Sequence, residues 1–321
     1  MPALDPQVEN LLELARKAGR PPFEALSPGE ARAAYAASWD VLQPPAAEVA
    51  SMRDLTIAGP AGDLALRVYR GSGTAPDEQL PCMVFLHGGG WVIGNLESHD
   101  RLARILANQA RICVVAVDYR LAPEHRFPAA LDDCAAALKW VVANTGLLAI
   151  TPGRIGIGGD SAGGNLAAVL ALMGRDGSAP ATMFQALIYP VTDLTATSAS
   201  YQRVTAGLPL TAATMHWFID HYAPEAASRR DWRASPLLAK SLAGTPPALV
   251  LTVAHDPLCD EGRAYAQRLE DEGVRVTALH LADHMHGMLM HGKLIAASNL
   301  MLDFVATLVG DALRRGAPVA A

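Results

Sequence analysis

Short apolar segments that alternate with helix-like segments are the feature that most limits the folds open to this chain. The central apolar segments are continuous rather than alternating, as expected for strands covered on both faces. Strands that alternate with helices predict a mostly parallel sheet connected by crossover helices. The expected strands span residues 55–58, 64–69, 82–87, 112–117, 154–158, 184–189, 248–253 and 275–280, and the expected helices span 100–110, 129–144, 162–173, 261–272 and 291–314.

Two segments interrupt this alternation and divide the chain into four parts. Residues 1–45 are expected to be helical, with a helix start at Ser27-Pro28-Gly29-Glu30. Residues 192–233 hold no good strand but carry Met215, Trp217, Phe218 and Tyr222 at helical spacing. We therefore predict a core formed by residues 46–191 and 234–321, with residues 1–45 and 192–233 as a helical cap. A gating lid and a peripheral helical layer are equally compatible with these two segments.

Composition and charge exclude several classes of protein. Hydrophobic residues make up 51% of the 321 positions, which suffices for a large core. The balance of 26 Lys and Arg against 32 Asp and Glu includes no basic stripe, so nucleic acid is not expected as a partner. Residues 1–17 lack the pattern of a signal peptide, and no uninterrupted apolar run is long enough to span a membrane. The four cysteines form no C-x-x-C pair, and we expect a soluble cytoplasmic protein.

The strongest local motif is Gly159-Asp160-Ser161-Ala162-Gly163, which follows one predicted strand and precedes a predicted helix. In this context G-x-S-x-G indicates a nucleophile elbow, where a sharp turn exposes the serine hydroxyl. Small neighbours let the strained chain pass without a clash. Ser161 is therefore the expected nucleophile, although the pattern alone also occurs in ordinary glycine-rich turns.

A second motif, His87-Gly88-Gly89-Gly90-Trp91, follows the apolar strand that ends near residue 86. Consecutive glycines leave backbone N–H groups accessible to a carbonyl oxygen. Together with the N–H of Ala162, they would form an oxyanion hole for a tetrahedral intermediate. A phosphate-binding loop would need Gly-Lys-Ser or Gly-Lys-Thr, which is absent here.

A serine nucleophile needs a histidine base, and the base needs a carboxylate that orients it. The chain order serine, acid, histidine places the base after the last strand, where His284, His286 and His291 are the candidates. We predict His286, because Gly287 relieves crowding around its ring. His284 and His286 could together chelate a metal, but nothing completes a zinc set, so no metal is expected.

The acid is expected at the carboxyl end of the preceding strand. Asp256 follows the apolar run 248–253, whereas Asp260 and Glu261 fall in the first turn of the next helix, where acids favour the helix dipole. We therefore predict Asp256 as the acid.

These motifs together resemble the hormone-sensitive-lipase-like esterases, the bacterial type with a GDSAGG elbow. The resemblance rests on HGGGWVIGNLESHD (87–100), DYRLAPEHRFPAALDD (118–133), GDSAGGN (159–165), SPLLA (235–239), DPLCDEG (256–262) and His286-Gly287. It implies an α/β-hydrolase fold with a mostly parallel eight-stranded sheet, flanking helices and a helical cap. It also implies a Ser161, Asp256 and His286 triad, with Gly88, Gly89 and Ala162 as oxyanion donors.

The resemblance further implies a serine carboxylesterase that acts on small-molecule esters with short to medium acyl chains and needs no cofactor. Members of the family often form homodimers, so a homodimer is the expected assembly. Trp91 beside the glycines and Met288 after His-Gly are candidate residues of the substrate pocket, although Trp91 could equally pack against the cap. Three positions depart from the family pattern, namely Ala254, Asp283 and Met288.

Two alternative functions remain open from sequence. The same machinery would serve an amidase, a deacetylase or a lactonase, because it recognises a tetrahedral carbon rather than the leaving group. A non-catalytic ligand-binding relative is the other, although the retained His286 counts against it.

Overall fold

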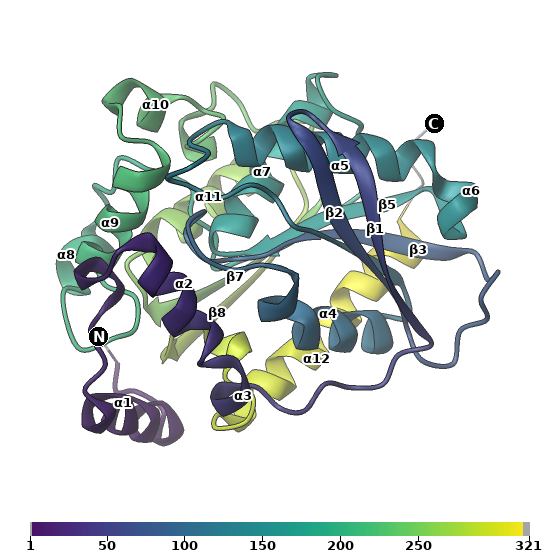
Figure 1. Cartoon of the computed structure of the whole chain (residues 1–321). Coiled ribbons are helices and arrows are strands. Elements are labelled where there is room, and N and C mark those ends of the chain that lie inside the picture. Colours follow the sequence, from purple (N-terminus) through teal and green to yellow (C-terminus); the bar gives the residue numbers. More distant parts are fainter. Residues whose placement is uncertain (1, 317–321) are drawn as a thin grey trace.

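The computed structural model describes residues 2–316 and contains one eight-stranded sheet (Figure 1). Its strands run in the order β1-β2-β4-β3-β5-β6-β7-β8. The pairs β1·β2 and β2·β4 are antiparallel, and all the other neighbours are parallel. The strands are β1 (Ser51–Gly59), β2 (Gly62–Arg70), β3 (Leu80–Leu86), β4 (Cys113–Val117), β5 (Ile150–Asp160), β6 (Gln185–Ile188), β7 (Ala248–His255) and β8 (Val276–Met285). This arrangement confirms the predicted α/β-hydrolase architecture with its mostly parallel eight-stranded sheet.

Helices cover both faces of the sheet. The helices and 3₁₀ turns are α1 (Pro6–Ala18), η1 (Phe23–Ala25), α2 (Pro28–Ala36), α3 (Trp39–Leu42), α4 (Leu96–Ala110), α5 (Ala129–Ala143), α6 (Thr145–Leu148), α7 (Ala162–Arg175), α8 (Ala199–Arg203), α9 (Ala212–Tyr222), α10 (Ala226–Arg230), η2 (Pro236–Leu238), α11 (Cys259–Asp271), η3 (Met288–Met290) and α12 (Ala296–Arg315). Side chains of α5, α7 and α11 pack in one buried cluster, and those of α4 and α12 pack in another across the sheet. Figure 1 shows these two layers above and below the strands.

Local capping chemistry sets several helix starts. Ser27 and Glu30 form the predicted capping box, with Pro28 at the first helical position. Helix α4 begins at Leu96 rather than at residue 100, because Asn95 forms a capping box with Ser98 that the sequence analysis missed. Helix α12 begins at Ala296 rather than at residue 291, because the chain after β8 first forms η3.

Helix α12 is the one described helix that is long and apolar enough to cross a membrane by length and composition. Its sequence includes the polar residues Asn299 and Asp303. In the fold it lies against α4 and the sheet, and it buries Leu302, Val305 and Val309. These side chains complete the core on that face of the sheet.

The two helical segments outside the core lie side by side. Figure 1 shows α8 and α9 next to the N-terminal helices, at the end of the sheet where β7 and β8 finish. The hydroxyl of Thr214 in α9 donates to Glu24 in η1 at 2.7 Å. The rings of Phe23 and Phe218 lie 6.1 Å apart between the same two elements. Residues far apart in the chain therefore form one layer over the carboxyl ends of the strands.

Candidate active site

Ser161 occupies a strained turn between β5 and α7. Its φ of 55° and ψ of −118° lie in a region that residues other than glycine rarely adopt. Its backbone N–H donates to the carbonyl of Ile188 at 2.8 Å, which ties the turn to the end of β6. A serine at the start of a helix usually accepts a hydrogen bond from a backbone N–H of the first turn. The hydroxyl of Ser161 makes no such bond with α7, so it is available for other contacts.

The glycines around Ser161 are required by the close approach of β3. A Cβ at Gly163 would lie 1.9 Å from the carbonyl oxygen of Leu86, and one at Gly159 would lie 2.3 Å from the same atom. Neither contact could be relieved without moving backbone. The G-x-S-x-G spacing therefore follows from the packing of two strands and a helix at this turn.

The structure brings His286 and Asp256 to Ser161. The Nε2 atom of His286 lies 2.9 Å from Ser161 Oγ, and Nδ1 lies 2.7 Å from Asp256 Oδ2. Asp256 is fully buried just after β7, and its other oxygen accepts the N–H of Leu258 at 2.8 Å. With Nδ1–H donated to the carboxylate, Nε2 is free to accept the serine proton.

The other candidate histidines have different partners. His284 pairs through Nδ1 with Asp283 at 2.7 Å. His291 bonds the carbonyl of Gly287 through Nδ1 at 2.8 Å. Burial and the neighbouring His286 together lower the pKa of His291 to about 4, against the opposing effect of that hydrogen bond. Neither ring is bonded to the serine.

The alternative acids are also engaged elsewhere. Asp260 pairs with Arg203 at 2.7 Å. Glu261 accepts the N–H of Thr192 at 2.8 Å, and burial raises its pKa well above the usual range. Asp256 is therefore the one of these three carboxyl groups that bonds His286.

In the segment 87–94, which we call the glycine loop, one expected oxyanion donor already has an acceptor within the protein. The N–H of Gly88 donates to the buried carboxylate of Asp160 at 2.9 Å, so it cannot also serve an oxyanion. The N–H groups of Gly89, Gly90 and Ala162 have no acceptor among residues 2–316. Because Gly88, Gly89 and Gly90 are identical residues, the sequence could not show which of their N–H groups would be hydrogen-bonded within the protein.

Trp91 and Met288, the expected pocket residues, are both buried. Both side chains have 0% exposure. The ring of Trp91 stacks on Tyr222 of α9, with the ring centroids 4.3 Å apart, so Trp91 packs against the segment that we predicted as a cap. Met288 belongs to η3 and lies in the buried cluster that includes side chains of α4 and α12.

Two aromatic residues, Tyr189 and Phe218, lie next to His286 and the glycine loop. No site role was predicted for either of them from sequence. The ring of Tyr189 lies 4.6 Å from the imidazole of His286, and its backbone has a positive φ of 35°. Phe218 of α9 lies directly over the glycine loop, since a Cβ at Gly90 would lie 2.2 Å from its ring. Neither contact could be read from sequence, because each joins segments from different parts of the chain.

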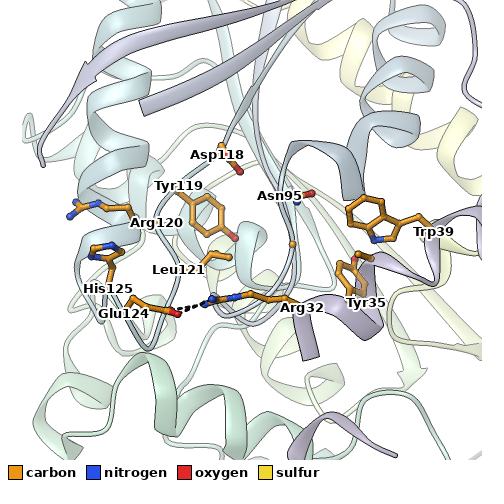
Figure 2. A pocket seen from close by; sticks show the side chains of 12 residues that line it. Arg32, Tyr35, Trp39, Asn95, Asp118, Tyr119, Arg120, Leu121, Glu124 and His125 are labelled. Atoms are coloured by element: carbon orange, nitrogen blue, oxygen red, sulfur yellow. Dashed lines mark hydrogen bonds and ion pairs between the residues drawn. The ribbon is translucent and has the colours of Figure 1, made fainter. Parts of the chain in front are cut away.

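A separate surface cavity of about 450 Å³ lies between α2 and the loop after β4 (Figure 2). An ion pair of 2.6 Å between Arg32 and Glu124 crosses its lower part. Asp118 and Tyr119 also line it, whereas Ser161 and His286 do not. Among the described residues, no group of three or more His, Cys, Asp or Glu side chains could hold a metal ion.

Comparison with known proteins identifies related sequences over most of the chain. Residues 83–290 match a family described by the α/β hydrolase fold. Carboxylic ester hydrolase LipN of Mycobacterium tuberculosis is 43% identical over 242 residues, which are 74% of this chain but 64% of LipN, less than two thirds of that protein. Ethyl acetate hydrolase of Pseudomonas putida is 39% identical over 288 residues, 89% of this chain and 91% of the relative.

A solved structure extends the similarity to the whole fold. It is an α/β hydrolase enzyme from the metagenome of Lake Arreo, Spain, and is 41% identical with a TM-score of 0.91. The match covers 96% of this chain and 98% of the other, so both helical segments outside the core are included.

Proposed function

The chain belongs to the α/β hydrolase family and is a carboxylic ester hydrolase, and on this premise we propose that it cleaves short- to medium-chain acyl esters through Ser161, His286 and Asp256. Its resemblance to hormone-sensitive-lipase-like carboxylesterases is confirmed. The observation that carries the proposed mechanism is the continuous hydrogen-bonded series from Asp256 through His286 to Ser161.

The proposed reaction proceeds through an acyl-enzyme. His286 Nε2 takes the proton of Ser161 as Oγ bonds the acyl carbon, and Asp256 stabilises the resulting imidazolium. The tetrahedral intermediate collapses, the bond to the alcohol oxygen breaks, and the alcohol leaves with the proton from Nε2. Water then adds to the acyl carbon while His286 Nε2 takes its proton. The bond between Ser161 Oγ and the acyl carbon breaks as Nε2 returns the proton to Oγ, which releases the carboxylic acid and free Ser161.

The negative charge on the tetrahedral oxygen needs donors that are already in place. We assign this role to the N–H groups of Gly89, Gly90 and Ala162, in place of the expected set that included Gly88. Ala162 is the first residue of α7, where the positive end of the helix dipole also favours an anion. The lack of competing acceptors for these three amides in residues 2–316 supports the assignment.

The proposed range of about C2–C8 acyl groups follows from crowding above the glycine loop. Phe218 is 3% exposed and packs on Gly90, so the cap leaves little room beside the proposed oxyanion donors. The relative named ethyl acetate hydrolase acts on a two-carbon acyl group, which is consistent with a short acyl pocket.

Location and assembly are part of the proposal. The four cysteines are free and buried, which fits the reducing cytoplasm expected from sequence. A homodimer is proposed from the family resemblance alone, and light scattering of the purified protein would test it.

The test is a panel of p-nitrophenyl esters from acetate to dodecanoate, with matched p-nitroanilides. We expect highest kcat/KM at short to medium chain length and no comparable anilide turnover. Ser161→Ala and His286→Ala should each reduce kcat by about 10³-fold or more with an unchanged far-ultraviolet circular dichroism spectrum. Preferred cleavage of the anilides, or activity retained in Ser161→Ala, would contradict the proposal.

A further inference from the structure

Asp160 directly precedes Ser161 but has no contact with His286, so the proposed reaction leaves its role open. Its side chain is 4% exposed and lies beneath the glycine loop. Oδ1 accepts the N–H of Gly88 at 2.9 Å. A Cβ at Gly88 would lie 2.3 Å from Oδ2, so only glycine allows this approach of loop and carboxylate.

A buried carboxylate needs a second partner, and His99 of α4 supplies it. His99 is 2% exposed, with Nε2 at 3.1 Å from Asp160 Oδ1 and Nδ1 at 2.8 Å from Ser98 Oγ. A carboxylate only accepts hydrogen bonds, so in the tautomer with the proton on Nε2 the ring donates to Asp160 Oδ1, and Nδ1 faces the Ser98 hydroxyl. Nε2 also lies 3.3 Å from the backbone nitrogen of Gly88, so His99 lies against the same peptide that Asp160 holds.

The hydrogen bonds on Gly88 also control its neighbour. The Gly88 carbonyl accepts from His87 Nδ1 at 2.7 Å, and its N–H is held by Asp160. The peptide that joins Gly88 to Gly89 is trans and planar, so the N–H of Gly89 points opposite to the Gly88 carbonyl. Fixing both ends of Gly88 therefore fixes the direction of the Gly89 N–H.

We propose that Asp160 and His99 form a positioning pair, which anchors Gly88 to the end of β5 and so aims the Gly89 N–H at the developing oxyanion. The inference rests on the proposed function, in which that amide stabilises the tetrahedral intermediate. A carboxylate acceptor holds an N–H more strongly than a neutral one, and His99 offsets the cost of burying it. The pair thus links two neighbouring parts of the site, the serine turn and the glycine loop.

The test compares His99→Leu and Asp160→Ala with the conservative variants His99→Gln and Asp160→Asn. The first two should lower kcat by about 10- to 100-fold at unchanged KM, less than the 10²- to 10³-fold typical of deleting an oxyanion donor. A trifluoromethyl ketone adds to the serine and places an oxyanion in the same position. Its inhibition constant should rise by the same factor as kcat/KM falls. The conservative variants, which retain a donor or an acceptor, should recover most of the loss.

Asp133→Ala is the matched control. Asp133 is also buried and paired, with Arg120 at 2.8 Å, but it does not contact the glycine loop. This variant should lose stability while keeping both kcat and the affinity for the ketone. An equal loss of ketone affinity in Asp133→Ala would overturn the proposal, because the effect would then be general loosening.

Hydrogen exchange gives a readout that does not depend on turnover. Peptides covering residues 87–94 should exchange faster in His99→Leu than in the wild-type protein, and no faster in Asp133→Ala. Unchanged exchange together with unchanged ketone affinity would overturn the positioning role. Absence of ester turnover in the wild-type protein would instead reject the proposed function, and the exchange rates would still decide whether the pair holds the loop. If Asp160→Ala fails to fold, His99→Leu still tests the pair.

Discussion

The role of a single residue in this site depends on which hydrogen-bonding groups its neighbours leave free. Gly88 and Gly89 are chemically identical and adjacent, yet only the N–H of Gly88 is taken by Asp160. His87 shows the same dependence. Its Nδ1 bonds the carbonyl of Gly88, while burial lowers the pKa of the ring to about 3, assisted by His99 and opposed by Asp160. His87 therefore serves the glycine loop as a neutral donor.

That lowered pKa predicts a specific loss of stability in acid. Below about pH 6.5 the unfolded chain takes up a proton at His87 that the folded protein does not bind until about pH 3. The free energy of unfolding should therefore fall with decreasing pH across this window, by at most about 1.4 kcal/mol per pH unit from this group. Urea unfolding at pH 7.5, 6.5, 5.5 and 4.5 should show a shallower decline for His87→Gln than for the wild type.

His125→Gln is the control for this measurement, because His125 is exposed. Its pH dependence should match that of the wild-type protein. Parallel curves for His87→Gln and the wild type would show that His87 is not held neutral.

At the scale of elements, the cap layer depends on contacts between α9 and η1. The Thr214–Glu24 hydrogen bond joins the two, and Phe218 extends from α9 over the glycine loop. Helix α9 thus carries both a structural contact with the N-terminal segment and the side chain that narrows the proposed acyl pocket.

Shortening Phe218 should widen the range of acyl chains. Phe218→Ala removes the ring above Gly90, so the ratio of kcat/KM for decanoate to that for butyrate should rise by about 10-fold. The cavity should also cost roughly 3 kcal/mol of stability. Initial rates on the p-nitrophenyl ester series, measured well below the melting temperature, would check this.

Phe304→Ala on α12 is the matched change, because Phe304 is 46% exposed. It should leave chain-length preference unaltered. If Phe218→Ala keeps the wild-type preference, the acyl chain does not pass beneath α9.

At the scale of the whole molecule, the segment 192–233, which we predicted as a cap insertion, is hydrogen-bonded to α7 at both of its ends. Asn165 of α7 is fully buried, and its side-chain amide donates to the carbonyls of Val191 at 3.0 Å and Ala234 at 2.8 Å. These two residues flank the segment 192–233. One side chain in the motif after Ser161 therefore closes both ends of the insertion onto the helix that begins at the serine.

Removing the side-chain amide of Asn165 should destabilise the fold. Asn165→Ala leaves two buried carbonyls without their donor, at a cost of about 3 kcal/mol in the free energy of unfolding. Urea unfolding followed by tryptophan fluorescence should shift to lower denaturant, since Trp217 and Trp232 lie within the insertion. Asn299→Ala, which removes one exposed side-chain hydrogen bond to Gly292, should cost less than about 1 kcal/mol. Equal losses of stability in the two variants would contradict a special role for the Asn165 hydrogen bonds to Val191 and Ala234.

The sequence alone determined the sheet, its helical layers and the chain order of the proposed serine, acid and base. These follow from local patterns, since apolar runs specify covered strands and Gly159 and Gly163 mark a turn where only small residues fit. The helix starts at Leu96 and Ala296 were misplaced, because capping and a 3₁₀ turn are short-range details that apolar periodicity does not record.

Only the tertiary structure decided which groups meet. The capture of the Gly88 amide by Asp160, the stacking of Trp91 on Tyr222 and the position of Phe218 over Gly90 each join residues more than 70 positions apart. Sequence shows which donors and rings a segment carries. Whether a donor is free or a ring is covered depends on side chains that packing brings in from elsewhere. The proposed oxyanion donors and the crowding above Gly90 could therefore be inferred only from the folded chain.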